Sequence, residues 1–585
     1  MTEYFEVHER DGAARLGELR LPEPLVTPAL GDEVLEDAGS LWPADRDAPE
    51  GDEAALTVLP HRAFPSGTDE RVQEAFAVDY PDVDYPSAAV VTAQTAADYG
   101  ADAYVLSGAP GLVGHAEAFV ENVLAVREAV PADTALVLSG VATPANVATL
   151  AYAGVDLVDS DRAHVRGLEG FYLTTDGEAF LEDLRELPCA CEACRTPREE
   201  FDRGDCARHN VNALRAELAR VRERIRAGRL RDYIEGQARH EAWLTATFRR
   251  LDDEYGYLEQ RTPVVRRGEL LAASEDSLRR VEIQRFADRV TSRYHNRFDA
   301  PLVVVPCSAR KPYGDSQSHE QFRRAVDYRA HKLSMTSPIG VVPQELELTY
   351  PAQHYDSVVT GRWSADEVEF VASVLARYLE GNDYPRYVAH VPPGGYQRVI
   401  ESVEERLGVE FEYTVADHPT TEESLAALSE TLDGEPRYRK REREHNTVRA
   451  VADWQFTCES GPAGDALFGD ITTGGRYPGL RVLSEGEQLA TLVKPYGTLA
   501  LTLAGGRRWV DSDADTLRVD IEGFVPQGSV LAPGVTGASE AIRVGDEVVV
   551  EGPAAFGVGR AAMSGPEMRE STRGVAVDVR HVEEA

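Results

Sequence analysis

The stretch Leu302-Val-Val-Val-Pro-Cys-Ser308 decides the fold of the middle of the chain, because an apolar run leads directly into a proline and a cysteine. A short apolar run that ends at a turn residue is typical of a buried strand, and the residues after it lie in the loop at the strand's carboxyl end. A helical pattern around residues 275–297 precedes the run. Because α/β sheets bind ligands at the carboxyl ends of their strands, we expect an α/β domain over residues 262–433 with Cys307 in a ligand-binding loop.

Residues 1–250 alternate short apolar runs with helical stretches. The apolar runs lie at 88–92, 103–106, 135–138 and 155–158, and helical patterns near 116–129 and 144–153 separate them. Such repetition predicts parallel strands joined by crossover helices, in a barrel or a doubly wound sheet. Residues 210–250 close this region as a long, arginine-rich helical segment.

The remainder of the chain has a different texture. From about residue 446, glycine-rich turns separate short β-branched runs, and the last part is typical of a small β-barrel. We expect a linking α+β domain over 446–506 and the barrel over 508–583. At roughly 150 residues per domain, the chain of 585 residues is predicted to be a multidomain α/β protein.

The chain carries 61 basic and 100 acidic residues, a formal charge of −39, and only four of its basic residues are lysine. An acidic, lysine-poor composition is typical of halophilic archaea. At molar salt the Debye length is about 3 Å, so this charge does not exclude an RNA partner. The amino-terminal residues are charged, and no apolar run approaches the roughly 18 residues of a membrane helix. We therefore expect a cytoplasmic protein without a membrane segment.

Three cysteines, Cys189, Cys191 and Cys194, lie close together, and Cys206 and His209 follow. Thiolates and imidazole are the ligands of tetrahedral structural zinc, so this spacing predicts a closed zinc site. The spacing leaves open whether His209 or Cys206 is the fourth ligand. Free buried cysteines are the alternative.

A second group of reactive residues follows the apolar run at 302–305. Arg310 and Lys311 lie within four residues of Cys307, and His319 comes twelve residues after it. Nearby cations favour thiolate over thiol, and a histidine can move its proton. The pattern predicts a nucleophile, although a lone cysteine after a strand is often a small buried apolar residue.

Several segments of the first half resemble archaeal tRNA-guanine transglycosylases: residues 142–144, 150–160, 172–177, 187–194 and His209-Asn210. The resemblance implies that the three clustered cysteines and His209 bind zinc. It also implies that Asp159 stands where that family has its glycosylase nucleophile. The family's Asp-Ser-Gly-Gly segment, which supplies a second essential aspartate, is missing. We therefore expect a degenerate TIM-barrel-like transglycosylase region, in which Asp159 serves as a substrate-binding residue.

The string Pro306-Cys-Ser-x-x-Lys-Pro-Tyr-x-x-Ser-x-Ser-His319 resembles the signature of the archaeosine synthase family, as do residues 336–347 and 354–361. The resemblance implies that the nitrile of 7-cyano-7-deazaguanine (preQ0), at D-loop position 15 of archaeal tRNA, becomes an amidine or its amino-acid adduct. It implies catalytic roles for Cys307, Lys311 and His319. Substrate binding is implied for Ser308, Ser316 and Ser318.

Further expectations concern partners. The resemblance implies lysine, glutamine or ammonia as nitrogen donor, a radical SAM partner enzyme, and a homodimer. Residues 508–583 resemble a PUA domain, a small RNA-binding barrel, which makes tRNA the expected partner. Arginines at 220–231 and 437–443 are candidate phosphate contacts, and a solvated helix face is the other interpretation.

Two alternative functions remain at this point. One is a tRNA-guanine(15) transglycosylase that inserts preQ0, with Asp159 as nucleophile and Asp156 or Asp161 as the second carboxylate. The other is a non-catalytic tRNA-binding partner, for which Cys307 would be dispensable.

Overall fold

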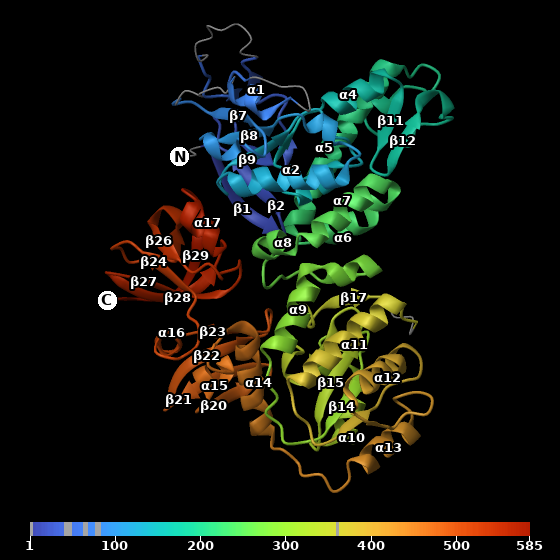
Figure 1. The fold of residues 1–585 in the computed structure, drawn as a ribbon, viewed down its shortest axis with the longest axis vertical. Helices are drawn as coiled ribbons and strands as arrows, with labels where there is room; N and C mark the ends of the chain where they lie inside the picture. Colours follow the sequence, from blue (N-terminus) through green and yellow to red (C-terminus); the bar gives the residue numbers. More distant parts are fainter. Residues whose placement is uncertain (1–3, 40–49, 62–67, 76–82, 359–361) are drawn as a thin grey trace. The chain divides into compact units, whose positions relative to one another are not determined.

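The computed structural model describes residues 4–39, 50–61, 68–75, 83–358 and 362–585. The chain divides into two compact units (Figure 1). The first contains Met1–Pro263, Leu531–Pro533 and Pro566–Ala576, and the second contains Val264–Val530, Gly534–Gly565 and Val577–Ala585. Across the described ranges, no helix combines the length and apolar character needed to cross a bilayer.

The first unit is built on a parallel sheet in the order β4-β10-β9-β8-β7-β6-β5. Its strands are β4 (Ala29–Leu30), β5 (Leu35–Asp37), β6 (Leu56–Val58), β7 (Ser87–Val91), β8 (Ala103–Leu106), β9 (Ala135–Leu138) and β10 (Leu157–Val158). The prediction of parallel strands with crossover helices is confirmed. The two edge strands, β4 and β5, follow one another in the chain, so the sheet curls back toward its own start.

The curled sheet encloses one apolar interior. Side chains from β4 and from β6 to β10 share a core with Phe5, Val7 and Leu19, which belong to the antiparallel sheet of β1 (Phe5–Asp11), β2 (Ala14–Leu19) and β3 (Leu25–Thr27). This common core is the interior of a barrel-like sheet. Three helices connect strands of this sheet: α1 (Glu70–Ala75), α2 (Ala116–Ala129) and α3 (Val147–Tyr152). A fourth, α4 (Asp161–Leu168), follows β10.

A hairpin and four helices complete the first unit: β11 (Phe171–Thr174), β12 (Gly177–Phe180), α5 (Arg203–Arg226), α6 (Leu230–Gln237), α7 (Ala242–Asp253) and α8 (Tyr255–Arg261). Asp202 caps α5 in a capping box with Asp205. Arginines of this region bind carboxylates within it: Arg220 of α5 pairs with Glu217, and Arg229, just before α6, pairs with Asp232.

The second unit begins with an α/β sheet in the order β16-β15-β14-β18-β19. All its pairs are parallel except β15 with β16. The strands are β14 (Leu302–Pro306), β15 (His331–Thr336), β16 (Gly340–Pro343), β18 (Tyr387–Ala389) and β19 (Phe411–Tyr413), and β13 (Leu270–Ala272) pairs with β17 (Tyr355–Ser357). All five residues of β14 are buried, as the apolar run predicts.

Helices cover both faces of this sheet (Figure 1). On one face α10 (Gln317–Val326) and α13 (Glu422–Thr431) pack on Val303 and Val305. On the other face α9 (Val281–Ser292), α11 (Ala365–Glu380) and α12 (Gly395–Leu407) join the core of Leu302 and Val304. The helix after β14 and the helix after β18 therefore lie on opposite faces, which is the topological switch point of a doubly wound sheet.

Two further sheets with their helices complete the second unit. The helices α14 (Lys440–Gln455), α15 (Ala463–Phe468) and α16 (Leu503–Val510) accompany an antiparallel sheet of β20 (Thr472–Arg476), β21 (Gly479–Ser484), β22 (Glu487–Val493) and β23 (Thr498–Leu501). The carboxyl-terminal sheet has the order β25-β29-β28-β27-β24-β26. It contains β24 (Arg518–Ile521), β25 (Ser529–Leu531), β26 (Val535–Ala538), β27 (Glu547–Gly552), β28 (Ala555–Ala561) and β29 (Val575–Glu584), with α17 (Gly565–Glu570) before the last strand.

Candidate functional site

Cys307 lies at the switch point, directly after β14. Its backbone N–H donates to the Met335 carbonyl at the end of β15, at 3.1 Å. Its Sγ lies 3.1 Å from the Tyr396 Oη, and Tyr396 is in the first turn of α12, after β18. This contact spans the carboxyl ends of β14 and β18, where α/β sheets bind ligands.

Lys311 lies close enough to Cys307 for their charges to interact. Burial lowers the pKa of Lys311, and the Cys307 sulfur opposes that shift. The Lys311 ammonium lies 3.9 Å from the centre of the Tyr355 ring, and the Tyr355 hydroxyl contacts Tyr313 Oη at 2.6 Å and Thr336 Oγ1 at 2.7 Å. The thiol therefore lies among hydroxyl groups and one cation, which can stabilise a negative sulfur.

Tyr396 keeps a phenolic proton that it can donate to a negative Cys307 sulfur. Burial and then the neighbouring Cys307 raise the pKa of its phenol above the ordinary value, so the hydroxyl keeps its proton at neutral pH. Tyr396 is not among the residues predicted from the sequence. A sequence signal for it exists, because Pro392-Pro-Gly-Gly-Tyr396 follows the apolar run of β18 just as the signature loop, Pro306–His319, follows β14. Only the strand order shows that these two loops meet.

The other residues of the signature loop make local contacts. Both ring nitrogens of the buried His319 are engaged, Nε2 with the Pro306 carbonyl at 3.0 Å and Nδ1 with Lys332 Nζ at 3.2 Å. Burial and the charge of Lys332 hold the pKa of His319 well below its usual value. Ser316 accepts from the His319 N–H as the N-cap of α10 and lies 3.4 Å from the Ser318 hydroxyl. Ser308 donates to the Arg310 carbonyl at 2.8 Å.

The cysteine cluster of the first unit converges with a histidine. The ligand atoms of Cys189, Cys191, Cys194 and His209 all lie within 4.8 Å of one another. Zinc–sulfur bonds of about 2.3 Å in a tetrahedron separate ligand atoms by roughly 3.8 Å, so a metal ion fits the group after small shifts. Cys206 lies outside the group, and its thiol contacts the Phe171 carbonyl at 3.4 Å.

His209 is oriented for a metal by its surroundings. Its Nε2 lies 2.9 Å from the Leu173 carbonyl, so Nδ1, at 3.3 Å from the Cys194 sulfur, is the ligand nitrogen. Its ring stacks on Tyr172 with centroids 3.7 Å apart. Burial lowers the pKa of His209, which favours the neutral ring that binds metals. A backbone carbonyl on the second ring nitrogen is the usual support of a metal-binding histidine.

Asp159 lines a cavity of about 920 Å³ at the carboxyl ends of the first unit's strands, together with Asp161 and His164. The Gly140 N–H lies 2.9 Å from both carboxylate oxygens of Asp159, and burial raises the pKa of that carboxyl. Asp156 has a different place. It is 1% exposed, pairs with Arg15, and accepts from the Leu136 N–H at 2.8 Å, so it holds the strands together.

Family models match four parts of the chain. They are queuine tRNA-ribosyltransferase over residues 85–242, a domain of unknown function (DUF5591) over 283–432, the patch-forming domain C2 of tRNA-guanine transglycosylase over 446–515, and the PUA domain over 521–582. The second of these segments, described as a domain of unknown function, contains β14, Cys307 and Tyr396.

Named relatives match over the whole length. The archaeosine synthase of Haloferax volcanii is 66% identical, with 100% of both chains covered, which agrees with a halophilic composition. The archaeosine synthase subunit alpha of Methanosarcina acetivorans is 41% identical, again with 100% of both chains covered. A tRNA-guanine(15) transglycosylase of Methanothermobacter thermautotrophicus is 26% identical over 79% of this chain and 68% of its own. By its identity to full-length relatives, the chain belongs to the archaeosine synthase family.

Proposed function

We propose that the protein modifies archaeal tRNA by converting the nitrile of preQ0, at D-loop position 15, into an amidine or its amino-acid adduct. Similarity to archaeosine synthases over the full chain supports the reaction class. The observation that carries the proposal is the Cys307 thiol in contact with Tyr396 at the switch point of the second unit's sheet. In this proposal residues 262–433 are the catalytic domain, 1–250 a transglycosylase-like region, 446–506 a linking domain, and 508–583 a PUA domain.

The proposed reaction begins with addition of the Cys307 thiolate to the nitrile carbon. The C≡N bond becomes C=N, its nitrogen takes a proton, and a thioimidate forms. An amine, from lysine, glutamine-derived ammonia or free ammonia, then adds to the same carbon and loses a proton. The C–S bond breaks, the thiolate leaves, and an amidine remains, so nothing is oxidised or reduced.

Residue roles follow from the contacts around the thiol. The Tyr396 hydroxyl donates to the thiolate, and Lys311, whose pKa burial lowers, supplies a proton to the imide nitrogen as it develops charge. Ser308 and Ser318 are proposed to bind the base. His319 is proposed to position the loop, because its ring is engaged with Pro306 and Lys332.

Zinc, tRNA and the remaining partners are part of the same proposal. Cys189, Cys191, Cys194 and His209 would hold one structural zinc ion, because three thiols and an imidazole match its preferred ligands. The matches to the PUA and C2 domains support tRNA binding. A homodimer, a radical SAM partner enzyme that acts on an amino-acid adduct, and a cytoplasmic location remain predictions.

The experiment uses the full chain in concentrated potassium chloride with tRNA that carries preQ0. Lysine, glutamine and ammonium are offered separately, and the mass of the modified nucleoside is followed. Wild type and Cys307→Ala are compared with Cys458→Ala, which removes another partly buried free cysteine. We expect a donor-dependent mass gain in wild type and Cys458→Ala that is lost in Cys307→Ala. A gain that persists in Cys307→Ala would overturn the assignment.

A second candidate function is base exchange at Asp159, because that carboxylate lines a cavity of about 920 Å³ with Asp161. The ion pair of Asp156 with Arg15 leaves Asp161 as the candidate for a second carboxylate. Release of labelled guanine from unmodified tRNA, lost in Asp159→Asn, would support exchange. No release, together with the nitrile reaction, would exclude it.

A further inference from the structure

A cavity of the second unit, which we call the basic cavity, adjoins the signature loop. Its volume is about 300 Å³, and its wall includes residues of α10, β15, α14 and β20. Residues 312–319 contribute several of its lining atoms, whereas Cys307 does not line it. Five of its side chains are basic and two are acidic: Arg323, Lys332, Arg443, Arg476 and Lys494, with Asp315 and Glu347.

Lys332 forms the buried part of the wall. Its side chain belongs to β15 and the residue is 8% exposed. Within the part of the chain that the structure describes, its ammonium has one hydrogen-bond partner, His319 Nδ1 at 3.2 Å. An ammonium has three donors, so two remain for a ligand. Buried donors without a partner are costly, which favours an anion in this cavity.

Of the other four basic side chains of the cavity, Arg323 lies 3.7 Å from the Glu320 carboxylate, and the remaining three are available. Among the described residues, no carboxylate lies within ion-pair distance of Arg443, Arg476 or Lys494, whereas Arg437, close by in sequence, pairs with Asp327. Acidic residues outnumber basic ones in this chain by 100 to 61. The cavity holds five basic side chains against two acidic ones. This local excess of positive charge is the exception in an acidic chain, and it points to a ligand that supplies negative charge.

Lysine usage supports the same conclusion. The chain has four lysines among its 61 basic residues, and two of them, Lys332 and Lys494, line this cavity. Arginine and lysine differ as ligands, because the ammonium is a compact point charge on a flexible stem. Ammonium groups combined with the guanidinium groups of Arg443 and Arg476 are typical of phosphate recognition.

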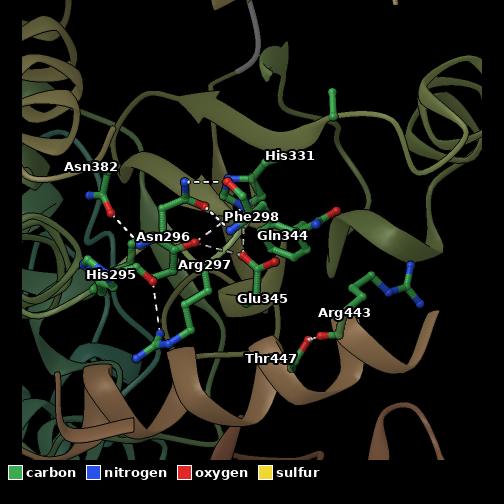
Figure 2. A network of polar contacts seen from close by, with 12 residues as sticks. His295, Asn296, Arg297, Phe298, His331, Gln344, Glu345, Asn382, Arg443 and Thr447 are labelled. Carbon is green, nitrogen blue, oxygen red and sulfur yellow. Dashed lines mark hydrogen bonds and ion pairs between the residues drawn. The ribbon is translucent and has the colours of Figure 1, made fainter. Parts of the chain in front are cut away.

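Buried polar contacts lie next to the lining residues Gln344, Arg443 and Thr447, which Figure 2 shows. The His331 ring forms hydrogen bonds with the Tyr384 hydroxyl at 2.7 Å and with the Glu345 carboxylate at 3.0 Å. Glu345 directly follows the lining residue Gln344. Arg443 extends from α14 away from this pair (Figure 2). Glu347 accepts from the Gly314 N–H at 2.8 Å and from Tyr477 at 3.0 Å. A wall held in this way loses little entropy when a ligand binds.

We propose that the basic cavity binds a phosphate group, carried either by an RNA backbone or by a small phosphorylated molecule. A carboxylate offers two oxygens and one charge, whereas a phosphate offers more oxygens and can contact Lys332 at the buried wall and Arg443 and Arg476 nearer the opening. These contacts act at hydrogen-bond range, where molar salt screens them least. The inference goes beyond the nitrile reaction and does not depend on it.

The test is a titration of the full chain with inorganic phosphate in potassium chloride at constant ionic strength, followed by calorimetry. We expect saturable binding that Arg443→Gln and Arg476→Gln each weaken about tenfold, which is the loss of about 1.4 kcal/mol. Arg481→Gln, which changes an exposed arginine on β21 outside the cavity, should bind as wild type does. Lys332→Met should bind least, provided that its circular dichroism matches wild type.

Three results overturn the proposal. The first is no saturable phosphate binding by wild type. The second is equal binding by wild type, Arg443→Gln and Arg476→Gln. The third is acetate binding as tightly as phosphate, which would assign the cavity to carboxylates.

Further arms identify the source of the phosphate. Competition of phosphate with tRNA, together with weaker tRNA binding by Arg476→Gln, assigns it to RNA. Unchanged tRNA binding by a variant that has lost phosphate binding assigns it to a small molecule. Both readouts are independent of Cys307, so Cys307→Ala should bind phosphate normally even if the nitrile reaction fails.

Discussion

Replacement of Tyr396 by phenylalanine removes a single oxygen from the Cys307 site. That oxygen lies 3.1 Å from the Cys307 sulfur, and burial keeps the pKa of the phenol above its ordinary value, so the hydroxyl donates when the sulfur is negative. A hydrogen bond to a charged group contributes about 1.5–3 kcal/mol, and about 1.4 kcal/mol corresponds to a tenfold change. We therefore expect Tyr396→Phe to slow amidine formation by about 10- to 100-fold.

Alkylation of Cys307 measures the same effect without substrate. The chain is treated with iodoacetamide at neutral pH, and the peptide that contains Cys307 is quantified by mass spectrometry. The rate should also fall in Tyr396→Phe, although by a smaller factor, because a thiolate that loses a hydrogen bond becomes more nucleophilic. Tyr413→Phe is the control, because Tyr413 is an exposed tyrosine bonded to Glu404 at 3.0 Å. Wild-type rates of both alkylation and amidine formation in Tyr396→Phe would refute the role of this hydroxyl.

Three further predictions concern the rest of the molecule. Asp156→Asn should lower the free energy of unfolding by about 3–5 kcal/mol, because it leaves the buried Arg15 without its charged partner. Denaturant unfolding measures this loss, and the double variant Arg15→Leu/Asp156→Leu should lose less stability than Asp156→Asn. His209→Ala should release the bound metal while Cys206→Ser retains it, as read by elemental analysis of the purified chain; equal metal content in both variants contradicts the ligand set. Burial lowers the pKa of His390 to about 4, so as the pH falls the unfolded chain takes up this proton at a higher pH than the folded chain does. The free energy of unfolding should therefore fall by about 3 kcal/mol between pH 6.5 and pH 4. His390→Gln should flatten this pH dependence, and an unchanged pH dependence contradicts the assignment.

Local patterns in the sequence predict much of this molecule. The buried strand at 302–306, the parallel strands of the first half and the cluster of cysteines each depend on residues a few positions apart. Side-chain alternation, turn residues and ligand spacing act over that range. The edge strands β4 and β5 of the curled sheet were beyond such patterns, since strands of two or three residues carry almost no periodic signal.

The candidate site divides in the same way. Local sequence predicts Cys307 and Lys311 as a reactive pair, and the Cys189–Cys194 group as candidate metal ligands. Only the tertiary structure adds Tyr396, which is 89 positions from Cys307, selects His209 over Cys206 within the cluster, and assembles the basic cavity from segments between residues 312 and 494. The physical reason is that such contacts depend on strand order and on which face of a sheet each helix covers, and both are decided by packing of the whole core rather than by neighbouring residues.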